Sequence, residues 1–257
     1  MAKNRSGTGD PARTLELLWR KPGHGRAGRG PKQGLTVDAI VGTAITLADR
    51  EGIDAVTMRA LAQELGVTPM TLYTYVPGKA ELLDLMLDTV HQRMPRPEHT
   101  ATTPWRARVE AVAEANRALF RQHTWVAALN VTRPPLGPGS MDKYEHELGA
   151  FEGLGLDDVE MDASLAHLLA FVQSTARAAI DAQAVARDTA LSDADWWAAN
   201  APLLGQVFDP SRYPLATRVG AAAGEAHNAP SSPEHAYAFG LARVLDGFAR
   251  LIESRSG

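Results

Sequence analysis

Residues 57 to 79 constrain the fold more than any other part of this chain. The segment reads TMRALAQELGVTPMTLYTYVPGK and contains two short helical stretches separated by a glycine. In the first, apolar residues recur on one face after Thr57, a residue type that caps helix N-termini, and Gly66 suits the left-handed conformation in which many helices end. In the second, Thr68 is the expected cap and Pro69 takes the first helical position, where its missing N–H costs nothing. The pattern predicts a helix-turn-helix.

The second stretch leaves most of its surface for a partner. Only Leu72 and Val76, four residues apart, are obvious core anchors. The remaining side chains are expected on an outer face: Thr68, Pro69, Met70, Thr71, Tyr73, Thr74 and Tyr75. A helix that reads the major groove of DNA needs such a face.

Flanking segments complete a helical unit. Apolar residues at helical spacing between the cap Thr36 and Gly52 predict one helix: Val37, Ile40, Val41, Ala44, Ile45 and Ala48. After Pro77-Gly78 a further helix is predicted by Leu82, Leu83, Met86, Leu87 and Val90. Lys79 lies near the start of that helix and is expected to point toward the surface that the second stretch presents.

Residues 35 to 95 resemble the DNA-binding domain of the tetracycline-repressor (TetR) family of bacterial transcription regulators. The resemblance rests on the Thr-x-x-x-Leu-Ala-x-x-Leu-Gly-Val run, the Thr71-Leu72-Tyr73 triplet and the lysine that follows. It implies that Arg59 approaches a base edge, that Tyr73 and Lys79 hold phosphates, and that the major groove is lined by Met70, Thr71, Thr74 and Tyr75. Thr57, Thr68 and Pro69 complete the predicted DNA-contacting set.

The residue types suit these roles. Arginine can donate two hydrogen bonds to guanine, hydroxyls and lysine grip phosphate oxygens, and a Met or Thr methyl can touch the methyl of thymine. Structural alternatives remain open at this stage. The same pattern occurs in helical hairpins that bind nothing, Tyr73 could be a core aromatic with its hydroxyl at the rim, and Arg59 could be a solvated helix charge.

Length and composition predict two domains beyond a basic arm. The chain has 257 residues, 45% of them hydrophobic, which suffices for a small domain and a larger one. We expect a basic flexible N-terminal arm at 1–34, the helix-turn-helix domain at 35–95, and a helical ligand-binding and dimerisation domain at 96–257. The absence of cysteine excludes disulfides and cysteine-based metal sites. No apolar run approaches the roughly 18 residues of a membrane span, and no export signal precedes the arm, so a soluble cytoplasmic protein without a membrane partner is expected.

The N-terminal arm carries a charge opposite to that of the rest. Residues 1–35 hold eight basic and two acidic residues, a net charge of +6, whereas the remainder carries −10. Arg26 and Arg29, set among glycines, could follow a narrow minor groove, or the arm could be a disordered solubilising tail. A short helix that docks on the body is predicted by Leu15, Leu18 and Trp19. The G-x-G-x-x-G match at 23–28 lacks the flanking strand and helix of a dinucleotide site and is rejected.

The C-terminal half also reads as helical, so the predicted fold class is all-α: an N-terminal three-helix helix-turn-helix domain plus a helical effector-binding and dimerisation domain. Helices are expected near 109–120, after Met141, at about 162–186 and near 237–252. The stretch between the last two contains scattered prolines and an Ala-Gly run, and it is expected to be irregular.

The family resemblance extends to assembly and function. In that family the C-terminal half binds a small effector and forms a homodimer through two C-terminal helices of each subunit, and the two long predicted helices match this order. A dimer can read a palindromic double-stranded DNA operator with half-sites about 34 Å apart. The favoured function is a repressor that a small-molecule effector releases. The alternative is a helical ligand-binding or scaffold protein with a degenerate DNA-binding domain.

Catalytic, cofactor and metal sites are not expected. The sequence has no nucleophile elbow, metalloprotease motif or phosphate loop. The acidic group formed by Asp157, Asp158, Glu160 and Asp162 precedes a long predicted helix, where acids favour the positive end of the helix dipole. These residues are therefore interpreted as helix-start acids rather than metal ligands.

Effector contacts are predicted from a local resemblance to the tetracycline-binding branch around Thr132-Arg133-Pro134. This resemblance places five residues near a ligand: Val112, Asn116, Thr132, Arg133 and Glu147. Leu129 stands where that branch has a magnesium-holding histidine, and Val112 stands at the branch's asparagine, so tetracycline with magnesium is disfavoured.

Aromatic residues suggest a flat or hydrophobic effector, because ligand pockets combine many apolar walls with few polar groups. The candidates for such a wall, each of which could equally be plain core, are Phe120, Trp125, Tyr144, Phe171, Trp196 and Trp197. His167, on an apolar stretch, is expected to be a core histidine or a ligand contact.

Overall fold

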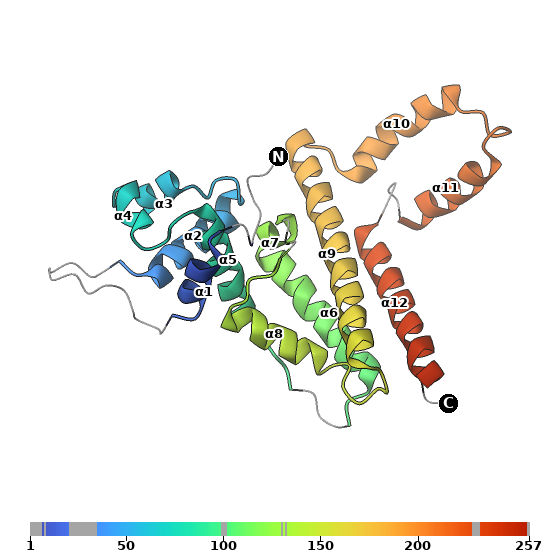
Figure 1. Ribbon diagram of the computed structural model, residues 1–257. Coiled ribbons are helices and arrows are strands. Elements are labelled where there is room, and N and C mark those ends of the chain that lie inside the picture. Colours follow the sequence, from blue (N-terminus) through green and yellow to red (C-terminus); the bar gives the residue numbers. More distant parts are fainter. Residues whose placement is uncertain are drawn as a thin grey trace.

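The described part of the computed structural model covers residues 7, 9–20, 35–98, 102–129, 131, 133–227 and 232–255. It is built from helices, and no strand occurs within these ranges (Figure 1). The elements are α1 (Pro11–Leu18), α2 (Val37–Glu51), α3 (Met58–Glu64), α4 (Pro69–Tyr73), α5 (Lys79–Gln92), α6 (Trp105–Gln122), α7 (Thr124–Ala128), α8 (Pro138–Leu148), α9 (Asp158–Thr189), α10 (Asp193–Val207), α11 (Pro214–His227) and α12 (Pro233–Arg255). The all-α prediction is confirmed.

Helices α2, α3 and α4 form the head of the molecule. Each of these helices begins with a threonine cap. The Oγ1 atoms of Thr36, Thr57 and Thr68 each accept the backbone N–H of the third following residue, over 3.1, 3.1 and 3.3 Å respectively. Each cap satisfies a donor that the helix itself leaves unpaired. Between α3 and α4, Gly66 has φ +65°. The local signals predicted from the sequence are therefore the ones that start and end these helices.

Helix α5 connects the head to the rest of the molecule and is enclosed on every side. All eight residues from Glu81 to Asp88 are buried, although three of them are acidic. The helix packs against α1 and α2 on the side of the head and against α8 on the side of the body. A helix buried all round cannot move without displacing its neighbours.

The acidic residues of α5 hold the N-terminal segment by its backbone. Glu81 Oε1 accepts the N–H of Asp10 at 3.1 Å, and Asp84 Oδ1 accepts the N–H of Gly7 at 2.9 Å. Burial, followed by the nearby charge of Glu81, raises the pKa of Asp84 to about 6, even though the hydrogen bond from Gly7 opposes the shift. The segment before α1 is thus fastened to the connecting helix.

Helix α1 is the short docking helix expected from the sequence. Leu17 and Leu18 are buried, whereas Leu15 and Trp19 are exposed. The indole Nε1 of Trp19 donates to the carbonyl oxygen of Leu136, at 2.8 Å, in the loop before α8. Residues 11–18 are therefore an ordered strap between α5 and the body, within the region expected to be a flexible arm.

The body is organised around α6, α9 and α12, and α9 and α12 run side by side (Figure 1). Phe151 and Phe248 meet edge to face with ring centroids 5.6 Å apart, and Phe171 stacks on Tyr237 at 5.8 Å. Helix α9 begins with a capping box made by Asp157 and Glu160. This cap confirms the interpretation of these two acids as helix-start residues.

The sequence prediction was wrong for the region between α9 and α12. It was expected to be irregular, but it forms α10 and α11, which project from the body as a hairpin (Figure 1). The error has a local cause: Pro202 lies inside α10 and was read as a helix breaker, while the capping box of Ser192 and Asp195 was overlooked. Neither helix has a buried residue.

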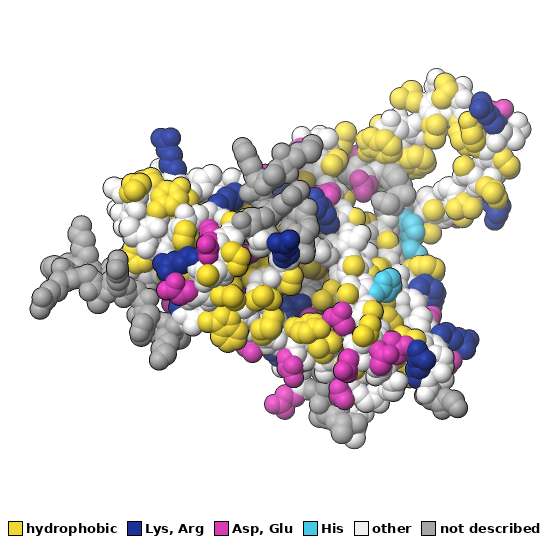
Figure 2. All heavy atoms as spheres, viewed as in Figure 1, with side chains coloured by type: hydrophobic (Ala, Val, Ile, Leu, Met, Phe, Trp, Pro, Cys, Tyr) yellow, Lys and Arg dark blue, Asp and Glu magenta, His cyan; other side chains and the backbone are white. Residues whose placement is uncertain are grey.

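The hairpin displays apolar side chains. Exposed members include Trp196, Leu203, Leu204, Val207, Tyr213, Leu215 and Val219. Figure 2 shows hydrophobic side chains along this hairpin and on the head at α3 and α4. Among the helices that the structure describes, none combines the length and the apolar character needed to cross a bilayer.

Candidate nucleic-acid interface and effector cavity

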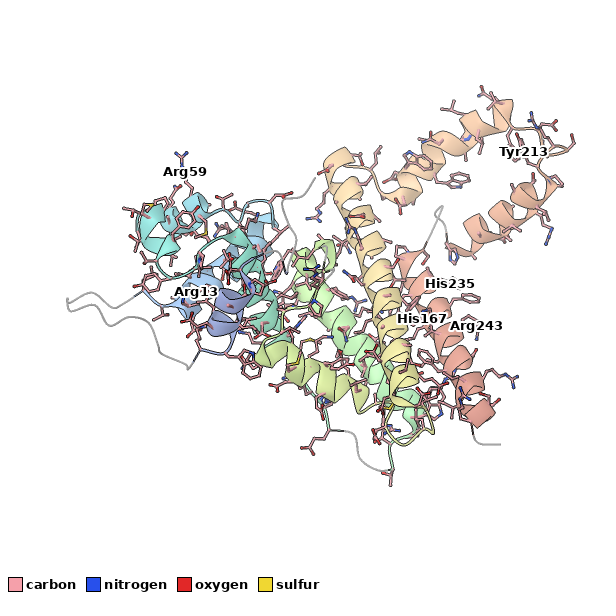
Figure 3. All side chains as sticks on the ribbon, in the orientation of Figure 1. Arg13, Arg59, His167, Tyr213, His235 and Arg243 are labelled. Carbon is pink, nitrogen blue, oxygen red and sulfur yellow. The ribbon has the colours of Figure 1, made fainter. Side chains whose placement is uncertain are left out.

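The outer surface of α3 and α4 presents the side chains expected to read DNA. Met70 is 73% exposed and Tyr73 is 45% exposed, and Thr74 and Pro69 are also exposed. Arg59 is exposed on α3 and points away from the body (Figure 3). Leu72 and Val76 are fully buried, as predicted. The exposure of Tyr73 argues against the core-aromatic alternative.

Several of the predicted contacts also have roles inside the head. The hydroxyls of Thr57 and Thr68 cap helices, and those of Thr68 and Thr71 lie 3.0 Å apart. Thr74 Oγ1 donates to the carbonyl of Thr71 at 2.7 Å. Tyr75 is half-buried and packs against the core. Among these residues, Thr71 and Tyr75 are half-buried, whereas Thr57, Thr68 and Thr74 are exposed.

Lys79 lies at the start of α5 beneath this surface. Its side chain is half-buried, and Nζ donates to the carbonyl oxygen of Ile53 at 3.3 Å. An ammonium group carries three donors, so this bond is compatible with a phosphate contact. The phosphate role of Lys79 stays a prediction. The predicted contacts Arg26 and Arg29 in the arm, and Thr132 in the effector domain, lie outside the described residues.

A cavity of the body lies between α6, α9 and α12 and has a volume of about 450 Å³. Its walls combine apolar and polar side chains: Arg117, Phe120, Arg121, Thr124, Thr175, Ala176, Ala179, Ile180, Gln183, Pro233, Glu234 and Tyr237. Of the predicted effector contacts, Phe120 lines this cavity. A volume of this size suits a small organic ligand.

Two other predicted contacts, Asn116 and Glu147, form a buried polar chain with Lys143 beside a much smaller hollow. Asn116 Nδ2 donates to Glu147 Oε1 at 2.5 Å, and Lys143 Nζ donates to Glu147 Oε2 at 2.6 Å. Asn116 and Glu147 are 2% and 3% exposed. Val112 and Glu147 line a hollow of about 10 Å³, too small for an organic molecule. This chain of hydrogen-bonded side chains connects α6 to α8.

The start of α8 is in turn bonded to α5. Asp88 accepts the backbone N–H groups of Gly139 and Ser140 at 3.3 and 2.8 Å. His91 Nδ1 lies 3.0 Å from Ser140 Oγ, and burial lowers the pKa of His91 to about 3. At neutral pH the imidazole is therefore uncharged. Polar contacts thus run from α6 through α8 to the connecting helix.

Trp125 joins the body to the head directly. Its side chain is almost fully buried, and Nε1 donates to Asp49 Oδ1 on α2 at 2.8 Å. His123 Nδ1 contacts the same oxygen at 2.8 Å. Trp125 does not line the cavity. Sequence reasoning missed Asp49 and His123. His123 lies 74 positions after Asp49 and Trp125 lies 76 positions after it, and no local sequence pattern relates residues so far apart.

The remaining predicted contacts are dispersed. Phe171 is half-buried against Tyr237, next to the cavity wall. Arg133 is exposed in the loop before α8. His167 is exposed on α9 (Figure 3), so the expectation of a core histidine was wrong. Its ring lies edge to face with that of Phe248. This error arose because helical spacing alone did not show which flank of the α9 apolar stripe is covered.

Three more of the expected wall aromatics lie elsewhere. Trp196 and Trp197 stack on each other in α10 at 6.3 Å, and Tyr144 is exposed and donates to Asp162 at 2.7 Å. None of them lines the cavity described above. Leu129, at the position of the branch's metal-holding histidine, is buried. The described residues contain no group of three or more potential metal ligands.

The sequence reasoning also missed the charged residues of the cavity. Arg117 Nη2 donates to Glu234 Oε2 at 2.6 Å, and the guanidinium lies 3.8 Å from the ring centroid of Tyr237. The hydroxyl of Tyr237 donates to Glu114 at 2.7 Å. The available signal was a pair of arginines, four residues apart, beside the apolar stripe of α6.

An exposed helix-turn-helix face, an enclosed connecting helix and a helical body with a ligand-sized cavity define the class of ligand-binding transcription regulators. Residues 40–86 match the family model described as bacterial regulatory proteins, tetR family, and residues 96–252 match the one described as tetracyclin repressor-like, C-terminal domain. The chain belongs to the TetR family of transcriptional regulators, so it is not an enzyme.

Individual relatives agree with this assignment. The chain is 42% identical over 255 residues to the HTH-type transcriptional repressor DrrR1 of Streptomyces coeruleorubidus, covering 98% of this chain and 90% of the relative. It is 24% identical over 226 residues to the tetracycline repressor protein class E of Escherichia coli, covering 86% and 94%. The crystal structure of the Streptomyces coelicolor TetR family protein ActR in complex with actinorhodin aligns with a TM-score of 0.70 at 28% identity, covering 84% and 96%.

Proposed function

We propose that this protein is a cytoplasmic homodimeric repressor that binds a palindromic operator and is released by a small molecule bound between α6, α9 and α12. The observation that carries the proposal is the set of polar contacts that joins the body, through α8, to the buried helix α5 beneath the reading face. The relative named as a repressor supports the assignment as a repressor, and the ligand-bound ActR structure supports the binding of a small molecule.

On the DNA side, we assign base reading to Arg59 and to the exposed side chains of α4. Arg59 can approach guanine O6 and N7, while Met70 and Thr74 present methyl groups to the groove. Tyr73 and Lys79 are assigned to phosphates, which fix the register without reading sequence. The hydroxyls of Thr57, Thr68 and Thr71 are secondary contacts, because each already serves a cap or a neighbour.

On the effector side, release follows from differential binding. A ligand that prefers a different spacing of α6 and α9 displaces α6, and the buried chain of Asn116, Glu147 and Lys143 passes that displacement to α8. Helix α8 is bonded to Asp88, so α5 and the head move with it. Coupling between such sites is typically about 1 to 3 kcal/mol.

The dimer is assigned to the outer faces of α9 and α12. Val185 and Phe239 are 58% and 56% exposed there, and His167 and several alanines share the exposed side of α9. Two heads in a symmetric dimer would address half-sites about 34 Å apart. Sedimentation equilibrium of the full chain tests the assignment, because a monomer at micromolar concentration would contradict it.

The deciding experiment is the selection of bound sequences from a random duplex pool at salt near the physiological concentration. A palindrome with two half-sites is the expected result. Sequence-independent or absent binding, tested with and without cell-extracted small molecules, would favour the alternative of a ligand-binding protein with a degenerate head.

The arm is tested by substitution rather than by deletion, since deletion would also remove α1 and its contacts with α5. Arg26→Ala combined with Arg29→Ala is expected to lower operator affinity and flatten its salt dependence. Unchanged affinity would make the arm a solubilising tail.

A further inference from the structure

Two arginines of the cavity converge on one carboxylate. Arg117 and Arg121 lie one turn apart on α6, and their Nη2 atoms are 2.6 and 3.6 Å from Glu234 Oε2 on α12. The hydrogen bond from Arg117 lowers the pKa of Glu234, so this carboxylate is ionised at neutral pH. The group that these arginines hold is thus an anion supplied by the chain itself.

The two arginines differ in exposure. The side chain of Arg117 is 14% exposed and is held over the ring of Tyr237, whereas that of Arg121 is 61% exposed. Glu234 is 72% exposed, in the first turn of α12. The buried guanidinium is therefore the fixed part of the site, and the carboxylate is the part that can leave.

The cavity has more positive than negative charge. Its ionisable lining residues, apart from Tyr237, are two arginines and one glutamate. Glu114 is the next acid: its carboxylate accepts the Tyr237 hydroxyl and lies 3.9 Å from Arg117 Nη1, but it does not line the cavity. The rest of the wall combines the apolar side chains of Phe120, Ala176, Ala179 and Ile180 with the uncharged polar ones of Thr124, Thr175 and Gln183.

We propose that the effector of this cavity is an aromatic anion. Its acidic group replaces the Glu234 carboxylate at Arg117 and Arg121, and its ring system lies against Phe120 and Ile180. Planar acids suit such a site, because a guanidinium offers paired donors to a carboxylate or sulfonate. This inference deepens the proposed function and rests on it.

The proposal makes Glu234 a competitor for the ligand. When the acid of the effector pairs with Arg117, Glu234 loses its ion pair with α6, and the hydrogen bond from Tyr237 to Glu114 is left between the start of α12 and α6. Helix α12 packs on α9, and the outer faces of these two helices are the ones assigned to the dimer. Ligand binding therefore alters the helix pair on which the separation of the two heads depends.

A matched pair of fluorescent probes tests the charge requirement. 1-Anilinonaphthalene-8-sulfonate and N-phenyl-1-naphthylamine share one ring system, and only the first carries an anionic group. Titration of the full-length protein is expected to give about tenfold tighter binding of the sulfonate, as a charge-assisted bond to a buried guanidinium predicts. Ala179→Trp, which fills the cavity, identifies the share of the signal that comes from this site.

Substitutions then assign the preference to residues. Arg117→Gln should abolish the preference for the sulfonate and leave the neutral probe unchanged, and Glu234→Gln should tighten the sulfonate by about threefold by removing its competitor. Arg121→Gln, at a more exposed position, gives a partial loss and protects the test against misfolding of the Arg117 variant. Arg250→Gln is the control: this arginine is exposed on α12 and pairs with Glu253.

Two results would overturn the inference: equal binding of both probes by the wild type, or a preference for the sulfonate that survives both arginine substitutions. If Ala179→Trp removes binding of the neutral probe while no preference exists, only the charge inference fails and the effector cavity stands. If Ala179→Trp changes the binding of neither probe, the cavity itself is misassigned, and the proposed function loses its effector site.

Discussion

The head and the body of this protein place their functional groups in opposite environments. In the head, Arg59, Met70 and Tyr73 are exposed over a small core, and the helices under them are held by caps. In the body, Asn116 and Glu147 are buried and hydrogen-bonded to each other. Substitutions of these exposed residues of the head should therefore change binding without changing stability, whereas substitutions of the buried residues of the body should change stability first.

The strongest effect on stability is expected among the buried, hydrogen-bonded side chains of the body. Glu147→Ala leaves the ammonium of Lys143, whose side chain is 11% exposed, without its carboxylate. We expect the free energy of unfolding to fall by about 3 to 5 kcal/mol. Urea denaturation measures it, and Glu145→Ala, at an exposed position of the same helix, should stay within about 0.5 kcal/mol. A small loss for both variants would contradict the claim that the buried residues of the body carry its stability.

A second test concerns the seam between α5 and α8. In Gly139→Ala the new Cβ would lie 2.1 Å from the carbonyl oxygen of Asp88, so the two helices must separate. We expect a loss of about 1 to 3 kcal/mol in stability, together with altered operator affinity. Gly42→Ala, where no atom lies within 4 Å, is the control and should be neutral or stabilising. Unchanged operator affinity in a destabilised Gly139→Ala protein would show that this seam does not position the head.

In the head, Arg59→Ala should relax specificity at one base position and cost about 1 to 3 kcal/mol of operator affinity. Its unfolding curve should match the wild type. Lys79→Ala should instead weaken all sequences and flatten the salt dependence of binding. Binding assays on operator variants separate the two, and an equal loss on every sequence for Arg59→Ala would contradict its assignment to a base.

The weakest effect is expected at Asp84, which holds the segment before α1 through the backbone of Gly7. Because the pKa of Asp84 is raised from 3.8 to about 6, the folded state holds this proton more tightly than the unfolded chain. The resulting stability is complete below about pH 4 and is lost as the pH rises through about 6. Asp84→Asn keeps an acceptor for Gly7 and should exceed the wild type by about 1 kcal/mol at pH 7.5, but not at pH 4. A pH-independent difference between the two unfolding curves would refute this account.

The sequence predicted most where structure is set by neighbours along the chain. Thr36, Thr57 and Thr68 cap within three residues of themselves, and Gly66 ends α3 through its own backbone. The cavity is different, because Arg117 and Glu234 are 117 residues apart and meet only when α12 packs on α6. Periodicity marked the helices of the body, but it did not show which flanks face each other.

The all-round burial of α5 also limits how members of this family could recombine. A hybrid with its crossover inside α5 would take Glu81 and Asp84, which hold the N-terminal segment, from one parent and Asp88, which holds α8, from the other. The strap formed by α1 would then face a foreign helix. A hybrid with a new head is therefore expected to function when α1 to α5 come from one parent and the surface of α8 fits the α5 of that parent.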